Sequence, residues 1–238
     1  MKGSLNDYAL PFFCVLAGLA FQYSGLDVRL ESLFYDPEHM GWPWRNAWFT
    51  KAFLHQGGHD LVVVIITGIL VIFISSFFNE GLKAYRQPTA FLILSSLTAV
   101  GIVGILKATT HMYTPWMLQD FGGKMPNIHL FDHVSSQLPI GHAFPSGHAS
   151  SGFALLSLYF LARHYQHRYT PYLLSVVLMI GFIFGIGQQM RGAHMFSHDM
   201  FALAICWLSC HAWARLFFPS PASHTSTDEH TLSLPTRS

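Results

Sequence analysis

The chain has 238 residues, of which 51% are hydrophobic and only 11% are charged, whereas soluble domains carry about 25% charged residues. Its formal net charge is +1, so it lacks the strong basic balance that indicates a nucleic-acid partner. Its three cysteines, Cys14, Cys206 and Cys210, all lie inside apolar runs. They are expected to be small buried hydrophobic residues rather than disulfide partners or metal ligands.

The apolar residues fall into six blocks, several of which approach the roughly 20 residues that a helix needs to cross a bilayer. These blocks predict an all-α fold, a six-transmembrane-helix bundle that forms one domain over residues 1–218. The expected spans are 8–25, 61–78, 89–106, 149–162, 172–188 and 200–218. The first is expected to be a retained span rather than a signal peptide, because it lacks a clean small-residue cleavage site. Residues 219–238, rich in Ser, Thr and Pro, are expected to be a disordered tail.

The connectors between the expected spans indicate the orientation of the bundle. Segments 79–88 and 163–171 are short and contain basic residues, and short cytoplasmic loops of membrane proteins carry an excess of Lys and Arg. We therefore expect the opposite end of the bundle to face away from the cytoplasm. On that outer side, the loop 27–60 carries several Trp residues between charges and is expected to lie at the level of the lipid headgroups.

The third expected span ends in a polar segment that begins with Lys107. On a continuing helix, Lys107, His111 and Thr114 would share one face at positions i, i+4 and i+7. Pro115 is expected to end that helix, because the residue before a proline disfavours the α region. Taken alone, Lys107 also fits a boundary lysine whose ammonium group reaches towards the headgroups.

The segment Pro145-Ser146-Gly147-His148 stands directly before the fourth expected span. Ser146 is a suitable N-cap, and the free N–H groups at a helix start favour an anion. Gly147 allows close approach to the backbone, and His148 can donate a proton at neutral pH. The alternative is a capped helix with an incidental histidine.

A second polar cluster stands before the sixth expected span and contains Arg191, His194, His198 and Asp199. Ionisable residues are costly at a membrane boundary and therefore indicate function. Phosphoryl transfer needs fixed positive charge on the phosphate oxygens and a nucleophile in line with the leaving oxygen. Arg191 can supply the charge and His194 the nucleophile, while a carboxylate such as Asp199 would fix the imidazole tautomer. The alternative is an interfacial group of polar side chains without chemistry.

These three segments open on the same side under the six-span topology, and in their order they resemble the type 2 phosphatidic acid phosphatase superfamily. That superfamily also includes bacterial acid phosphatases and vanadium haloperoxidases. Its pattern is Lys, six residues and Arg-Pro; then Pro-Ser-Gly-His; then Arg, five residues, His, three residues and Asp. Within roughly residues 90–215, the matching residues are Lys107, Pro115, Pro145, Ser146, Gly147, His148 and His194. The resemblance implies that His194 is the nucleophile, forming a phosphohistidine intermediate, and that His148 is the general acid.

The chain departs from this pattern at three positions. Thr114 stands in place of the first arginine and carries no charge. Gln188 stands in place of the second, with Arg191 one helical turn later. His198 stands where the pattern has Asp, and Asp199 follows it. Either His198 takes the supporting role or a local bulge brings Asp199 into place.

The resemblance implies a membrane lipid phosphatase with no cofactor and no metal. The phosphate group is expected to be bound by Lys107, His111, Thr114, Ser146, Gly147 and Arg191. The substrate would be a phosphomonoester or pyrophosphate on a lipid, such as phosphatidic acid, phosphatidylglycerophosphate, undecaprenyl pyrophosphate or lipid A. The loop 114–124 looks like that of a bacterial subgroup, so we expect a protein of the bacterial cytoplasmic (inner) membrane with its active site facing the periplasm or cell exterior.

Three alternatives remain open. A lipid phosphotransferase would use the same phosphohistidine, and the sequence does not separate it from a phosphatase. A metal-dependent membrane enzyme is suggested by the i, i+4 spacing of His194 and His198, although no His-Glu-x-x-His is present. A non-catalytic membrane scaffold would leave costly ionisable groups at the boundary without a role.

Overall fold

The computed structural model describes residues 6–219 of the chain. Within this range the regular secondary structure is helical, and β pairing is limited to the isolated bridges Asp36–Gly41 and Leu118–Met125. The all-α expectation is therefore confirmed. Apart from residue 219, the expected tail 219–238 lies outside the described residues.

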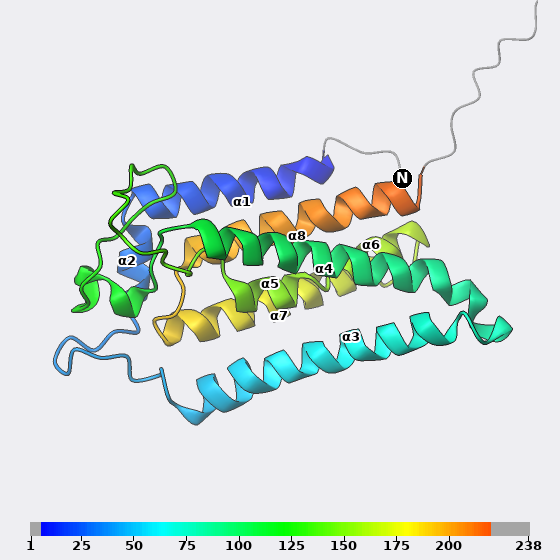
Figure 1. The fold of residues 1–238 in the computed structure, drawn as a ribbon, viewed down its shortest axis with the longest axis horizontal. Helices are drawn as coiled ribbons and strands as arrows, with labels where there is room; N and C mark the ends of the chain where they lie inside the picture. Colours follow the sequence, from blue (N-terminus) through cyan, green and yellow to red (C-terminus); the bar gives the residue numbers. More distant parts are fainter. Residues whose placement is uncertain (1–5, 220–238) are drawn as a thin grey trace, which may run out of the picture.

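The long helices run side by side along the long axis of the molecule, with α3 at one edge (Figure 1). The α-helices are α1 (Asn6–Tyr23), α2 (Leu26–Glu31), α3 (Gly58–Ser75), α4 (Arg86–Thr109), α5 (Gly147–Phe153), α6 (Leu156–His164), α7 (Thr170–Met190) and α8 (Phe196–Phe217). A π-helix, η1 (Phe49–Gly57), leads directly into α3, and three 3-10 helices are η2 (Glu80–Tyr85), η3 (Pro115–Met117) and η4 (Gln119–Phe121).

The core lies around α8, which packs against α1, α4, α5 and α6. Its largest fully buried side chains include Phe91, Phe153 and Phe160. The cysteines Cys14 and Cys206 belong to the same buried cluster, as does Cys210, and all three are free. The expectation that they act as small buried hydrophobic residues is therefore confirmed.

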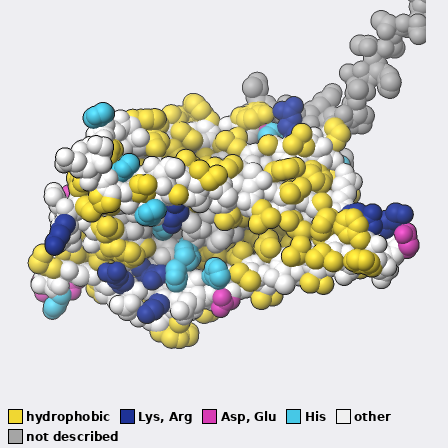
Figure 2. Space-filling view, in the orientation of Figure 1, with side chains coloured by type: hydrophobic (Ala, Val, Ile, Leu, Met, Phe, Trp, Pro, Cys, Tyr) yellow, Lys and Arg dark blue, Asp and Glu magenta, His cyan; other side chains and the backbone are white. Residues whose placement is uncertain are grey.

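Four helical segments are long and apolar enough to cross a membrane: Phe49–Ser75, Glu80–Thr109, Thr170–Met190 and Phe196–Phe217. Only 6% of the most apolar window of the first segment is buried. Apolar side chains also cover the middle of the visible face in Figure 2. An apolar surface of this extent on long helices is what a lipid environment requires. These helices therefore indicate a membrane protein.

The other two expected spans differ from simple membrane-crossing helices. The first corresponds to α1, which lies along α8 (Figure 1). The fourth is divided into α5 and α6 at Ala154 and Leu155. At this break the backbone tightens, because Leu155 N donates to the Gly152 carbonyl at 3.2 Å and Ser157 N donates to the Ala154 carbonyl at 3.2 Å.

Segment 27–60, which was expected to be a loop at the headgroup level, contains helix at both of its ends. α2 takes up its start, where Asp27 and Glu31 are buried. The π-helix η1 takes up its last part and continues into α3. Trp48 is 72% exposed, whereas the Trp42 ring packs against Tyr35 at a centroid distance of 5.5 Å. Only part of this segment can therefore lie in an interface with lipid.

Candidate active site

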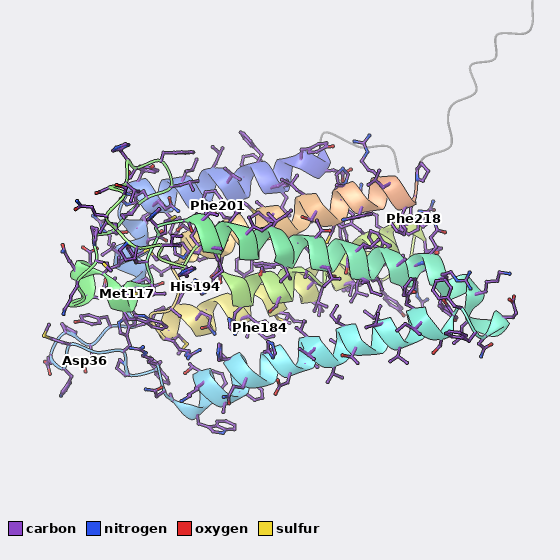
Figure 3. All side chains as sticks on the ribbon, viewed as in Figure 1. Asp36, Met117, Phe184, His194, Phe201 and Phe218 are labelled. Carbon is purple, nitrogen blue, oxygen red and sulfur yellow. The ribbon has the colours of Figure 1, made fainter. Side chains whose placement is uncertain are left out.

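Three segments far apart in the sequence meet at one end of the bundle. α4 and α7 end there, and α5 and α8 begin there. Figure 3 shows His194 at this end, with Met117 and Asp36, and Phe218 at the other end. Histidine and cationic side chains gather at the same end in Figure 2. The helix order thus produces the convergence that the sequence predicts.

The expected shared face of Lys107, His111 and Thr114 is wrong, because α4 ends at Thr109. Beyond it, the backbone of residues 110–112 pairs with that of 141–143: Gly141 N donates to the Thr110 carbonyl at 3.0 Å, and Ala143 N donates to the Met112 carbonyl at 3.2 Å. These bonds replace the helical ones that a continued α4 would need.

His111 consequently lies on the loop that follows α4. It lines a cavity of about 170 Å³ together with His129 and Asp132, among others, and not with His148. Thr114 lies on the loop whose Trp116 N donates to the Gly192 carbonyl at 3.1 Å, and its own hydroxyl is buried without a hydrogen-bond partner within residues 6–219. Thr114 therefore lies on a segment that is hydrogen-bonded to the α7–α8 turn, whereas His111 does not line the cleft that contains His148.

Lys107 and the Pro-Ser-Gly-His segment are in direct contact. A Cβ atom added to Gly147 would lie 3.3 Å from Lys107 Nζ, so the glycine is what lets the ammonium group lie against this backbone. Ser146 is the N-cap residue of α5, as predicted, although its side chain makes no cap hydrogen bond. Its N–H instead donates to the His198 carbonyl at 3.2 Å, which ties the start of α5 to the start of α8.

The turn between α7 and α8 carries the two buried histidines of the third motif. The rings of His194 and His198 lie edge to face, with centroids 5.8 Å apart. The Asp199 carboxylate accepts a hydrogen bond from Gln189 at 2.6 Å and lies against Gly185 of α7. His194 Nδ1 is buried and has no hydrogen-bond partner in the described part of the chain. Neither Asp199 nor His198 therefore orients the His194 ring through this atom.

A further histidine, His55, joins the site from the π-helix η1. Its ring stacks on that of His148, with centroids 4.0 Å apart and planes at 26°. Gln188 contacts His55 Nδ1 at 3.2 Å and accepts a hydrogen bond from Arg191 at 3.1 Å. His55 was not among the predicted site residues. The available signal was a pair of histidines, His55 and His59, directly before the second apolar block.

The two motif histidines outside the spanning segments are held neutral. Burial lowers the pKa of His194 well below its ordinary value, and the positive charges of Lys107 and of nearby histidines add to this effect. Burial also lowers the pKa of His148 to about 3, with further contributions from His55, Lys107 and Arg191. Lys107 and Arg191 thus supply positive charge beside two neutral imidazoles, which favours a bound anion.

Acidic residues of α2 lie close to the start of α8. Asp27 accepts a hydrogen bond from Ser197 N at 3.0 Å. Glu31, one turn later, is fully buried, and burial together with Asp27 and Asp199 raises its pKa well above its ordinary value. Burial raises the pKa of Asp27 as well, while the hydrogen bond from Ser197 lowers it, so this bond ties Asp27 to the N-terminal turn of α8.

Two clefts share His59 in their walls, and His148 lines the first of them. The first, about 480 Å³, is lined by the polar side chains of His55, Gln56, His59, Asp60 and His148. The second, about 290 Å³, is apolar and lies between α3 and α4, where Val62, Val63, Ile66, Leu97 and Val100 contribute to its wall. His59 lines both clefts, so a polar surface continues into an apolar one.

The fold and the site together indicate an all-helical membrane protein that carries a cluster of histidine and cationic residues at one end of its helix bundle. The family model of the PAP2 superfamily matches residues 88–221. The chain therefore belongs to this superfamily, as its motifs predict. Membership suggests a phosphatase, that is, a phosphoric ester hydrolase. No curated protein and no solved structure matches the chain.

Proposed function

We propose that this protein is a membrane lipid phosphatase that works through a phosphohistidine on His194. The observation that carries the proposal is the meeting of Lys107, His148 and His194 at one end of the bundle. The Lys107 ammonium group lies at the Gly147 backbone, and its charge acts on both histidines. A phosphate group placed there would meet a fixed cation, a neutral imidazole that can attack, and a second imidazole that can carry a proton.

In the first step, an imidazole nitrogen of His194 forms a bond to phosphorus while the bond between phosphorus and the lipid oxygen breaks. His148 gives its proton to that leaving oxygen. A bound phosphate dianion raises the pKa of His148, which is about 3 in the free site. In the second step, neutral His148 takes a proton from water, which attacks the phosphohistidine and releases inorganic phosphate. Lys107 and Arg191 balance the charge of the phosphate oxygens.

The adjoining apolar cleft supports a lipid substrate. It begins at His59, on the rim of the polar cleft, and runs between α3 and α4. An acyl or polyprenyl chain in it would place the phosphate group beside His148. We propose the bacterial cytoplasmic membrane as the location, with six spans and the site on the periplasmic side. The candidate substrates are phosphatidic acid, phosphatidylglycerophosphate, undecaprenyl pyrophosphate and lipid A.

Phosphate release by the purified protein in detergent tests this function. The candidate lipids and a water-soluble phosphate ester are compared, each with and without EDTA. The proposal predicts faster release from at least one lipid than from the soluble ester, and little effect of EDTA. Loss of activity in EDTA, restored by Zn²⁺, would support the metal-dependent alternative instead. No group of three or more His, Cys, Asp or Glu side chains in the described residues is arranged to hold a metal ion.

The same assay separates the remaining alternatives. A phosphotransferase would move the phosphate group to an added acceptor lipid and would release little inorganic phosphate without it. A non-catalytic scaffold would do neither with any lipid of the panel.

A further inference from the structure

His55 reaches the site through close packing of two helical segments. It lies in η1 (Phe49–Gly57), outside the residues that match the superfamily. A Cβ atom at Gly187 of α7 would lie 2.9 Å from Leu54, and one at Gly58 would lie 2.7 Å from the Phe184 ring. These two glycines let η1 and α7 approach closely enough for His55 to contact Gln188. π-helical segments of this kind occur frequently at functional sites.

A chain of hydrogen bonds fixes the protonation of His55. Arg191 Nε donates to the Arg45 carbonyl at 3.1 Å, and Arg191 Nη1 donates to Gln188 Oε1 at 3.1 Å. Because Gln188 Oε1 is turned towards the arginine, the amide nitrogen of Gln188 donates to His55 Nδ1 at 3.2 Å. Nδ1 is therefore an acceptor, and the neutral ring carries its hydrogen on Nε2.

The Nε2 edge of His55 has no protein partner within residues 6–219. The half-buried ring lines the polar cleft beside His148, on which it stacks. The cleft thus offers one oriented N–H donor next to the general acid. Through Gln188, this donor is polarised by the positive charge of Arg191, because donors and acceptors in a hydrogen-bond chain strengthen one another.

We propose that His55 is a phosphate-binding residue whose Nε2–H donates to a phosphate oxygen, so that His55, Gln188 and Arg191 act together where the superfamily pattern has a single arginine. Gln188 itself carries no charge, and Arg191 lies one turn further on. The arrangement delivers a charge-polarised donor to the phosphate group without a cation at position 188. This inference rests on the proposed phosphatase site and adds a residue that lies outside its three motifs.

Titration of the detergent-solubilised protein with orthovanadate, followed by calorimetry, tests this role. His55→Phe keeps an aromatic ring to stack on His148 but removes the donor, and we expect vanadate binding to weaken by about 10- to 100-fold, the worth of one hydrogen bond to a charged group. His55→Gln retains an amide donor and is expected to recover most of the loss. His167→Phe, an exposed position in the connector between α6 and α7 at the other end of the bundle, is the matched control and should bind as the wild type does.

The outcomes separate this inference from the proposed function. If His55→Phe binds vanadate within twofold of the wild type, His55 does not bind phosphate and the inference is wrong, while the phosphatase proposal stands. If His55→Gln is as weak as His55→Phe although both unfold at the wild-type temperature, the donor role is also excluded. If the wild type binds no vanadate, both the inference and the proposed function are contradicted.

Discussion

His148 and His194 share a site with two cations, Lys107 and Arg191, and both imidazoles are neutral there. Neutrality suits the attacking histidine, because only the unprotonated nitrogen has a lone pair to give. It does not suit a general acid. His148 can therefore act as an acid only when the substrate brings its own negative charge, which couples binding to protonation.

This coupling predicts how the His148→Ala variant depends on the leaving group. With a lipid alcohol, which needs a proton as it leaves, turnover should fall by about 10²- to 10⁴-fold, the usual contribution of a general acid. With p-nitrophenyl phosphate, whose leaving group is stable as an anion, the loss should be much smaller. Steady-state kinetics with both substrates measures the difference, and equal losses would remove His148 from this role.

The pH profiles of kcat/KM and kcat follow from the protonation states of His194 and His148. Burial holds the pKa of His194 in the free enzyme well below its ordinary value. Since kcat/KM reports the free enzyme, no loss of kcat/KM with an apparent pKa near 6.5 is expected from His194 on the acid side. On the alkaline side, kcat should fall as His148 loses its proton in the substrate complex. The alkaline fall should be clear with a lipid alcohol and weak with p-nitrophenyl phosphate. A loss of kcat/KM on the acid side, centred near pH 6.5 with both substrates, would contradict a neutral His194 in the free enzyme.

At the scale of the helices, the long apolar blocks made most of the fold predictable. α4, α7 and α8 lie within a few residues of the expected spans, because about 20 apolar residues leave a helix as the main choice in lipid. The end of α4 at Thr109 was not predictable, since it depends on backbone pairing with residues 141–143, far away in the sequence. At the break, the Ala154 carbonyl accepts a hydrogen bond from Ser96 Oγ of α4 at 3.2 Å, a contact that the local sequence does not record.

The candidate site was predictable only where motifs mark it. Lys107, His148 and His194 follow a known spacing, whereas His55 is recruited by the contacts of Gly58 and Gly187 with α7 and η1. Nothing in the local sequence of η1 records those contacts. The same holds for the buried carboxyl groups of α2, which look like surface charges in the sequence.

Close packing of α5 against α7 gives a test at this scale. A Cβ atom at Gly181 would lie 2.1 Å from the Phe153 ring, which is fully buried. Gly181→Ala should therefore destabilise the protein by about 1–3 kcal/mol, the usual cost of overpacking. Gly68→Ala on α3 is the matched control, because no atom lies within 4 Å of the added Cβ. Thermal unfolding in detergent compares the two, and equal midpoints would show that α5 and α7 are not packed this closely.

For the whole molecule, the helix order places the site at one end and the basic connectors at the other. The connectors contain Lys83, Arg86, Arg163 and Arg168, and Arg163 pairs with Asp7 at 2.5 Å. The positive-inside rule predicts that this end is cytoplasmic, which supports the proposal that the site faces outside. The three native cysteines are buried, so a single added cysteine can be labelled selectively.

We expect Asp120→Cys, near the site, to react with an impermeant thiol reagent in intact spheroplasts, and Arg168→Cys to react only after lysis. Both side chains are exposed in the structure, so a difference reports the membrane and not burial. Labelling in the opposite order would place the site in the cytoplasm. Labelling of both from outside would contradict the six-span arrangement.

The central claim is that His194 carries the phosphate group between two chemical steps. Rapid mixing of the protein with a lipid labelled with ³²P in its phosphate group, followed by quenching and peptide mapping, measures this directly. The account predicts a burst of label on the peptide that contains His194, stable in alkali and labile in acid, and no such label in His194→Ala. Turnover of the lipid by His194→Ala at the wild-type rate, or label that maps to another residue, would contradict it.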